Sequence, residues 1–231
     1  MNRHVVFCGA VACLVVASGG SAMAGGPDDP GGYRPELYRS AKLVFAEDFD
    51  YEGPLKAAGK WLVKQETQWN VEDGVLIGTP APVEYQEKMQ AIKDVHDGTR
   101  PVVILRETPK ELVMRMRLRY DGEHAERSYQ QLDFGHHINS FVFFPDRTKL
   151  TFKGGKKIFR KGDFFPTNKW ADVAVEIRDG KLLIQINDEK ELIKHERVTL
   201  DVGRPGRQVD FKGLDYGRVL IDWVEVYRGI D

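Results

Sequence analysis

The feature that most constrains the fold is a stretch in the middle of the chain where apolar and polar side chains alternate. Every second residue from Leu112 to Tyr120 is apolar, and the positions between them include Arg115, Arg117 and Arg119. Successive side chains of a β-strand point to opposite faces of its sheet, so this pattern gathers the apolar residues on one face. A helix would spread them around its axis. The stretch therefore predicts a half-buried β-strand over Leu112–Tyr120.

Short segments of the same kind recur along the chain, with turn sequences between them. The β-rich runs 171–177 and 182–186 are joined by Arg178-Asp179-Gly180-Lys181, which predicts a tight hairpin. Only Glu84–Val95 has apolar residues at helical spacing. Strands do not alternate with long helices, which disfavours a parallel α/β sheet. The pattern predicts an all-β fold, an antiparallel jelly-roll sandwich with a short helical insertion.

The start of the chain is typical of a secretory signal peptide. Residues 1–24 combine a weakly basic beginning, an apolar run over 5–16 and the small-residue cleavage site Ala22-Met23-Ala24. The apolar run is too short to span a bilayer comfortably, so we expect no stable membrane insertion after cleavage. We expect an exported protein, either periplasmic or extracellular. The glycine- and proline-rich start of residues 25–40 predicts a flexible linker, and residues 41–231 are expected to form the folded domain.

Composition limits the kinds of partner. Cys8 and Cys13 both lie in the segment to be removed, so the exported chain would be held together by its core alone. Of the 34 Lys and Arg residues, Arg3 lies in the same segment, which leaves 33 basic against 35 acidic residues. This balance, with charges interspersed, argues against nucleic acid as a partner. The sequence leaves the oligomeric state open.

Four segments together carry a resemblance to a known fold family: FAEDFD at 45–50, WNVEDGVL at 69–76, KWADVAVEI at 169–177 and IDWVEVY at 221–227. Their order resembles the concanavalin A-like (laminin-G-like) jelly rolls, and is most similar to the secreted family of 3-keto-disaccharide hydrolase domains. The first and last segments are also similar to strands of family 16 glycoside hydrolases. The resemblance covers residues 41–227 and implies a carbohydrate ligand or substrate on the concave sheet or its rim loops.

The catalytic candidates are Asp133, His136 and His137. The Glu-x-Asp-x-Glu pattern of family 16 enzymes, which supplies the paired carboxyls of a retaining glycosidase, is absent from this sequence. Instead, Gly135-His136, followed by an expected strand and the turn at Pro145, is similar to a Gly-His segment of the hydrolase family. A histidine beside Asp133 could act as a general acid–base pair or bind a metal. Surface or structural histidines are the alternative.

Substrate-binding candidates are aromatic and polar residues in expected loops or on the polar faces of expected strands. Tyr85, Tyr129 and the pair Phe164-Phe165 could stack on sugar rings, while other side chains could hold sugar hydroxyls or a carboxylate. For the arginines of the central strand, the alternative is a solvent face paired across strands, for example with Asp133 or Glu176. The polar candidates are Arg115, Arg117, Gln131 and Asn139.

A metal site is a further possibility. Asp48, Asp50 and Asp222 could supply oxygen ligands to calcium or another divalent ion. The alternative is a solvated strand end, and no EF-hand-type loop supports the metal. The metal requirement is left open.

Two functions follow from these observations. The first is an exported hydrolase of (3-keto) glycosides, and the second is a non-catalytic carbohydrate-binding or envelope domain on the same fold. Convergence of Asp133, one of His136 and His137, and a second carboxylate in one solvent-filled pocket would favour catalysis. A face lined only by aromatic and amide side chains would favour binding.

Overall fold

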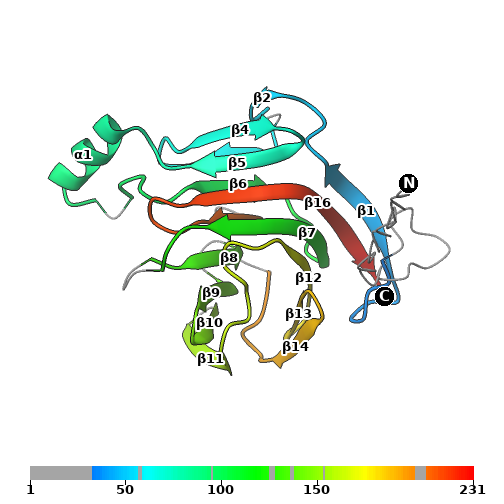
Figure 1. The fold of residues 1–231 in the computed structure, drawn as a ribbon. Helices are drawn as coiled ribbons and strands as arrows, with labels where there is room; N and C mark the ends of the chain where they lie inside the picture. The colour runs from blue at the N-terminus through cyan, green and yellow to red at the C-terminus, as the bar shows by residue number, and fades with distance from the viewer. Residues whose placement is uncertain are drawn as a thin grey trace, which may run out of the picture. The chain divides into compact units, whose positions relative to one another are not determined.

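The computed structural model describes residues 33–56, 59–94, 96–124, 128–135, 138–152, 154–200 and 207–231 (Figure 1). Residues 34–231 form one compact unit of two antiparallel sheets packed face to face. The predicted signal peptide, residues 1–24, and the predicted linker up to residue 32 lie outside the described residues. No helix among the described residues is long and apolar enough to cross a membrane.

The first sheet has nine strands and contains the predicted central strand. Its order is β14-β13-β12-β7-β16-β5-β4-β2, and β1 also pairs with β16, although the two strands are far apart in the sequence. The strands are β1 (Ser40–Glu47), β2 (Gly53–Pro54), β4 (Gln68–Glu72), β5 (Val75–Thr79), β7 (Leu112–Asp121), β12 (Ala171–Arg178), β13 (Lys181–Ile186), β14 (Glu189–Lys194) and β16 (Arg218–Ile230).

The second sheet has seven strands in the order β11-β10-β9-β8-β15-β6-β3. Its strands are β3 (Trp61–Val63), β6 (Val102–Arg106), β8 (Gln130–Phe134), β9 (Ser140–Phe144), β10 (Arg147–Phe152), β11 (Gly155–Lys161) and β15 (Gln208–Lys212). The helix α1 (Val83–Ala91) leaves the sandwich between β5 and β6 and overlaps the predicted helix at 84–95 (Figure 1). The predicted all-β jelly-roll sandwich with a short helical insertion is confirmed.

Strand β7 confirms the alternation on which the fold prediction rests. The side chains of Leu112, Met114, Met116, Leu118 and Tyr120 are all completely buried in the core between the sheets. The arginines between them are partly exposed on the opposite face of the nine-stranded sheet. The predicted hairpin also forms, because β12 and β13 pair in register around Gly180, whose φ is +72°.

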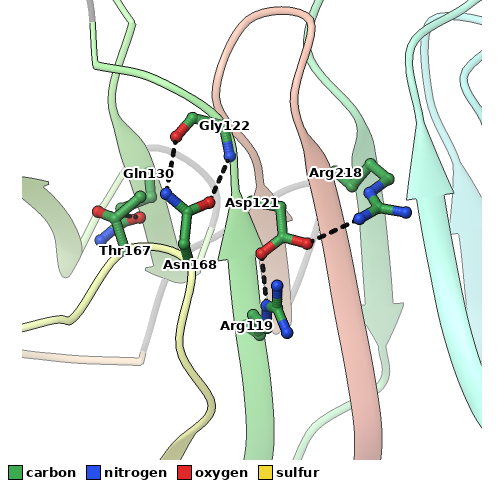
Figure 2. A network of polar contacts seen from close by, with 7 residues as sticks. All are labelled: Arg119, Asp121, Gly122, Gln130, Thr167, Asn168 and Arg218. Atoms are coloured by element: carbon green, nitrogen blue, oxygen red, sulfur yellow. Dashed lines mark hydrogen bonds and ion pairs between the residues drawn. The ribbon is translucent and has the colours of Figure 1, made fainter.

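A network of polar contacts fastens the end of β7 to its neighbours (Figure 2). The Asp121 carboxylate lies 2.5 Å from Arg119 Nε and 3.0 Å from Arg218 Nη2. Asn168, in the loop before β12, accepts a hydrogen bond from the Gly122 N–H at 2.9 Å and donates one to its carbonyl at 3.2 Å. These contacts join the turn after β7 to the loop before β12 and to the start of β16.

The folded unit begins earlier than the sequence predicts. The buried Glu176 carboxylate on β12 accepts hydrogen bonds from the backbone N–H groups of Glu36 and Leu37 at 2.6–3.0 Å. The buried Tyr38 hydroxyl donates to the Ile177 carbonyl at 2.5 Å. Residues 36–38 therefore belong to the sandwich, and the described unit starts at Arg34 rather than at Ala41.

Candidate functional site

Polar side chains gather on the outer face of the seven-stranded sheet, the face turned away from the core. On β15, Val209 and Phe211 point into the core, so Asp210 and Lys212 point outward. The register places Asp210 opposite Asp133 of β8, and Lys212 opposite Gln131. Directly opposite residues on antiparallel strands have Cβ atoms about 4.5–5.5 Å apart. Two carboxylates and an ammonium group therefore share one small area of the sheet.

The lysine bridges the two carboxylates. Lys212 Nζ lies 2.5 Å from Asp133 Oδ2 and 3.5 Å from Asp210 Oδ2. Asp133 also accepts a 2.6 Å hydrogen bond from Gln131 Nε2, and Asp210 accepts one of the same length from Gln208 Nε2. The side chains of Asp133, Asp210 and Lys212 are 0%, 4% and 15% exposed. Asp133 is thus enclosed, whereas Lys212 retains contact with solvent.

The environment of Asp210 makes it a better proton acceptor than an ordinary aspartate. Burial is the largest influence and raises the pKa of Asp210, and the nearby Asp133 raises it further. Lys212 and the hydrogen bond from Gln208 oppose this rise only in part. A carboxylate with a raised pKa in a partly dry site is suited to general acid–base chemistry.

A cavity of about 530 Å³ opens above this area, and Asp210 and Lys212 line it. Val102 and Ile104 of β6 contribute its apolar part. The remaining lining side chains come from loops, from α1 and from β8, and they include a second carboxylate, Asp97. They are Lys64, Gln65, Tyr85, His96, Asp97, Arg100, Tyr129 and Gln131. The volume falls in the range of small-ligand sites.

Arg100 holds one aromatic side chain of the cavity in position. Its Nε donates to the Gly213 carbonyl at 2.9 Å, and its Nη2 donates to the Tyr129 carbonyl at 2.7 Å. The same guanidinium lies 4.8 Å from the centre of the Tyr129 ring, whose other neighbour is Phe144 at 5.3 Å. Tyr129 is therefore an ordered aromatic surface at the edge of the cavity.

Three of the predicted substrate-binding residues meet at the cavity, namely Tyr85, Tyr129 and Gln131. Asp133 lies beside it, completely buried, and does not belong to its lining. His136 and His137 lie outside the described residues. Sequence analysis missed Asp210 and Lys212, although the alternating segment QVDFK at 208–212 was a signal for a strand with one polar face.

Other predicted site residues lie elsewhere. Arg115 and Arg117 belong to the nine-stranded sheet, where they pair with Glu225 at 3.2 Å and with Asp222 at 3.6 Å. Asn139 is completely buried with φ +46°, and its side chain donates to two backbone carbonyls, which is a structural role. Phe164-Phe165, expected as a sugar platform, is part of the hydrophobic core.

The predicted metal ligands do not gather. Within the described ranges, no three His, Cys, Asp or Glu side chains lie close enough to hold a metal ion. Asp48 and Asp50 are exposed, and Asp222 faces Arg117. Asp48 and Asp50 thus lie at a solvated strand end, and Asp222 forms a partly exposed ion pair.

Comparison with solved structures identifies the fold. An endo-β-galactosidase from Clostridium perfringens that releases GlcNAcα1-4Gal superposes with a TM-score of 0.59 and 14% identity, over 86% of this chain and 66% of that one. A non-specific endo-β-1,3(4)-glucanase of glycoside hydrolase family 16 gives 0.54 and 14%, over 85% and 94%. The laminarinase from Rhodothermus marinus gives 0.52 and 14%, over 85% and 100%.

These structures share a concanavalin A-like jelly roll, and the likeness at this identity establishes the fold of this chain. No protein-family model matches the sequence, and no curated protein matches it. The fold hosts different chemistries, so the activity must be argued from the site.

Proposed function

We propose that this protein binds a saccharide in the outer-face cavity and cleaves a glycosidic bond there. The observation that carries the proposal is Asp210, a carboxyl group with a raised pKa that lines the cavity beside Lys212. The activities of three structural neighbours, an endo-galactosidase, an endo-glucanase and a laminarinase, support the class of reaction. The finer proposal concerns the substrate, which we infer to be a 3-keto glycoside.

The cavity has the features that a sugar ring needs. Tyr85 and Tyr129 offer aromatic surfaces for the apolar C–H faces of the ring, and Gln131 and Lys64 offer donors for its hydroxyl groups. Its volume of about 530 Å³ is sufficient for a small saccharide. Apolar walls with a few convergent polar groups would fix the orientation of such a ligand.

A 3-keto substrate fits the arrangement of the cavity. Asp210 stands beside the cation Lys212, and no Glu-x-Asp-x-Glu segment supplies paired carboxyls, although Asp97 also lines the cavity. Direct displacement at the anomeric carbon of an ordinary glycoside uses two carboxyl groups that reach the substrate. A ketone at C3 makes the hydrogen on C2 acidic, so the same bond can be broken by elimination with one base and one cation. Asp210 and Lys212 supply that pair.

In this mechanism Asp210 removes the C2 proton, and the electron pair moves into an enolate whose oxygen sits at C3. The ammonium group of Lys212 stabilises that oxyanion. The enolate then expels the glycosidic oxygen from C1, and protonated Asp210 returns the proton to this leaving group. Water adds across the new C1–C2 double bond, with its hydroxyl on C1 and its proton on C2. The net reaction is hydrolysis.

Asp133 acts as a positioning residue in this proposal. It is enclosed, and its 2.5 Å contact holds Lys212 Nζ at a fixed place on the sheet. Its negative charge also contributes to the raised pKa of Asp210. The buried carboxylate would therefore influence the reaction without touching the substrate.

A non-catalytic carbohydrate-binding domain is the second candidate. Tyr85, Tyr129 and Gln131 favour it, because aromatic and amide side chains are sufficient to bind a sugar without catalysing a reaction.

Export to the periplasm or the exterior is part of both proposals. It rests on the signal-peptide pattern of residues 1–24 and on the absence of cysteine from residues 25–231.

Product analysis in D₂O tests the proposed reaction. The chain from Gly25 to Asp231 is incubated with 3-keto-disaccharides and with their unoxidised parents, and released monosaccharides are examined by NMR. We expect release from the 3-keto substrates, with one solvent deuterium at C2 of the new reducing unit. Product incubated alone corrects for spontaneous exchange. Release with C2 unlabelled would refute elimination, and no release would refute hydrolysis.

Two variants assign the chemistry to the cavity. Asp210→Asn should lower the rate by about 10²–10⁴, the usual contribution of a general acid–base group. Asp163→Asn is the matched control, because burial also raises the pKa of Asp163 but this residue does not line the cavity. Equal rates for Asp210→Asn and the control would remove Asp210 from the mechanism.

A further inference from the structure

A second, smaller pocket of about 200 Å³ lies where the two sheets meet at β1 and β6, and it shares no lining residue with the outer-face cavity. Strands β1 and β16 of one sheet, strand β6 of the other, and the loop after β6 form its walls. Its chemistry is distinct, because the cationic side chains that line it outnumber the carboxylates by four to one.

Four cationic side chains and one carboxylate line this pocket. The carboxylate is that of Glu107, whose Oε2 forms an ion pair with Lys60 Nζ at 3.1 Å. The remaining cations are Arg106, Arg207 and Arg228, and no described carboxylate forms an ion pair with any of them. The pocket therefore carries an excess of positive charge that the described part of the chain does not neutralise.

Two of these arginines are held in place by hydrogen bonds to backbone carbonyls, which do not neutralise their charge. Arg106 Nη2 donates to the Gly59 carbonyl at 2.8 Å, and Arg207 Nε donates to the Thr108 carbonyl at 2.9 Å. A hydrogen bond to a neutral carbonyl restricts the guanidinium and leaves its charge and its other N–H groups available. Such preorganised forks suit pairs of oxygen atoms on a carboxylate, sulfate or phosphate group.

A buried hydroxyl group in the same pocket has no partner. Thr108 is 3% exposed, and its Oγ1 makes no hydrogen bond within the described structure. A buried polar atom without a partner is unfavourable, and such atoms are rare in folded proteins. A ligand oxygen that accepted a hydrogen bond from Thr108 Oγ1 would remove this cost. This orphaned donor is an indication of a ligand that is independent of the charge.

The rest of the pocket is apolar. Val44 and Phe45 of β1, Leu105 of β6 and Val226 of β16 contribute aliphatic and aromatic surface to its lining. Val44 is 45% exposed, which is high for a valine in a strand. The pocket can therefore cover the carbon skeleton of a small molecule while the arginines hold its charged end.

We propose that this pocket binds a small organic oxyanion, a molecule with a carboxylate, sulfate or phosphate group on a compact carbon skeleton. Arg207 and Arg228 bind the anionic group, and Thr108 donates a further hydrogen bond to it. The site is separate from the proposed saccharide cavity and does not depend on the activity proposed there.

Titration calorimetry at low ionic strength tests the proposal with four probes: glucuronate, glucose 6-sulfate, glucose 6-phosphate and neutral glucose. We expect saturable one-to-one binding of at least one anionic probe, and the probe that binds identifies the oxyanion. Raising the salt concentration should weaken this binding, because salt screens partly exposed charges. No saturable binding of any anionic probe, or binding that neutral glucose matches, would overturn the proposal.

Two variants and a control locate the binding. Arg228→Gln should weaken anion binding by about tenfold or more, whereas Arg147→Gln, which changes an exposed arginine outside the pocket, should leave it unchanged. Thr108→Val should also weaken binding, yet leave the melting temperature of the ligand-free protein unchanged or higher, because it removes an orphaned hydroxyl. Equal affinity in wild type, Arg228→Gln and Thr108→Val would overturn the site.

Discussion

Replacing Lys212 by methionine tests whether the lysine is what allows two carboxylates to be buried side by side. The substitution keeps the volume of the side chain and removes its charge. Asp133 and Asp210 are 0% and 4% exposed, and Lys212 is the cation that ion-pairs with both. Without it, two opposite carboxylates on neighbouring strands would repel each other in a poorly solvated place.

The expected loss follows from this burial. Breaking a buried ion pair by removing one partner costs about 3–5 kcal/mol of unfolding free energy, whereas an exposed pair contributes less than about 1 kcal/mol. Lys190→Met is therefore the matched control, because its ion pair with Glu36 is about half exposed. We expect a large loss for Lys212→Met and a small one for the control.

The loss should also depend on pH. Lys212 lowers the pKa of Asp210, so its removal raises that pKa further above the value of an unfolded aspartate, about 3.9. A group whose pKa is higher in the folded state binds more protons there, so its contribution to stability is full below about pH 3.9 and is lost as pH rises through the folded pKa. The destabilisation by Lys212→Met should therefore grow from pH 4 to pH 8.

Urea unfolding followed by tryptophan fluorescence at pH 4, 6 and 8 measures both effects. The double variant Lys212→Met, Asp133→Asn should recover part of the stability at pH 8, because it removes one of the two unpaired charges. A loss below about 1 kcal/mol at pH 8, or a loss independent of pH, would refute the view that the lysine balances a buried carboxylate pair.

Three other substitutions have defined expected outcomes. Gly78→Ala would place a Cβ 2.4 Å from the Trp69 ring, so we expect about 1–3 kcal/mol lower stability in urea; unchanged stability would show that the ring moves freely. Glu176→Leu would leave two backbone N–H groups of residues 36–37 without their acceptor, at a cost of about 1–3 kcal/mol. Limited proteolysis should then cleave near residue 36 sooner than in wild type. Tyr129→Ala should weaken saccharide binding in calorimetry by about tenfold; unchanged affinity would place the sugar elsewhere.

The layers of the fold could be predicted from the sequence because they depend on local patterns. The alternation over 112–120 and the turn at Asp179-Gly180 each determine a strand or hairpin without reference to distant residues. The site depends on contacts between distant segments. Asp133 and Asp210 are neighbours only because β8 pairs with β15, and no local sequence pattern predicts that these two strands pair.

The same limit explains the residues that were misplaced. Alternation in β7 correctly put Arg115 and Arg117 on the polar face, but it could not say that this face belongs to the sheet without the cavity. Asn139 looked available for a ligand, yet its positive φ and its two bonds to backbone carbonyls make it part of a tight connection before β9. The spacing of residues predicted which face of a strand each side chain occupies. The sheet topology then determines whether that face lies at the cavity.

The most direct test of the central proposal is a calorimetric titration of a 3-keto-disaccharide into the chain from Gly25 to Asp231 and into its Asp210→Asn variant. We expect continued heat in the wild type until the substrate is consumed. The variant should instead give heat that saturates at a fixed stoichiometry, with the sugar recovered intact. Saturating heat in both proteins would contradict catalysis and leave a binding domain, and no heat in either would contradict the saccharide cavity for this ligand.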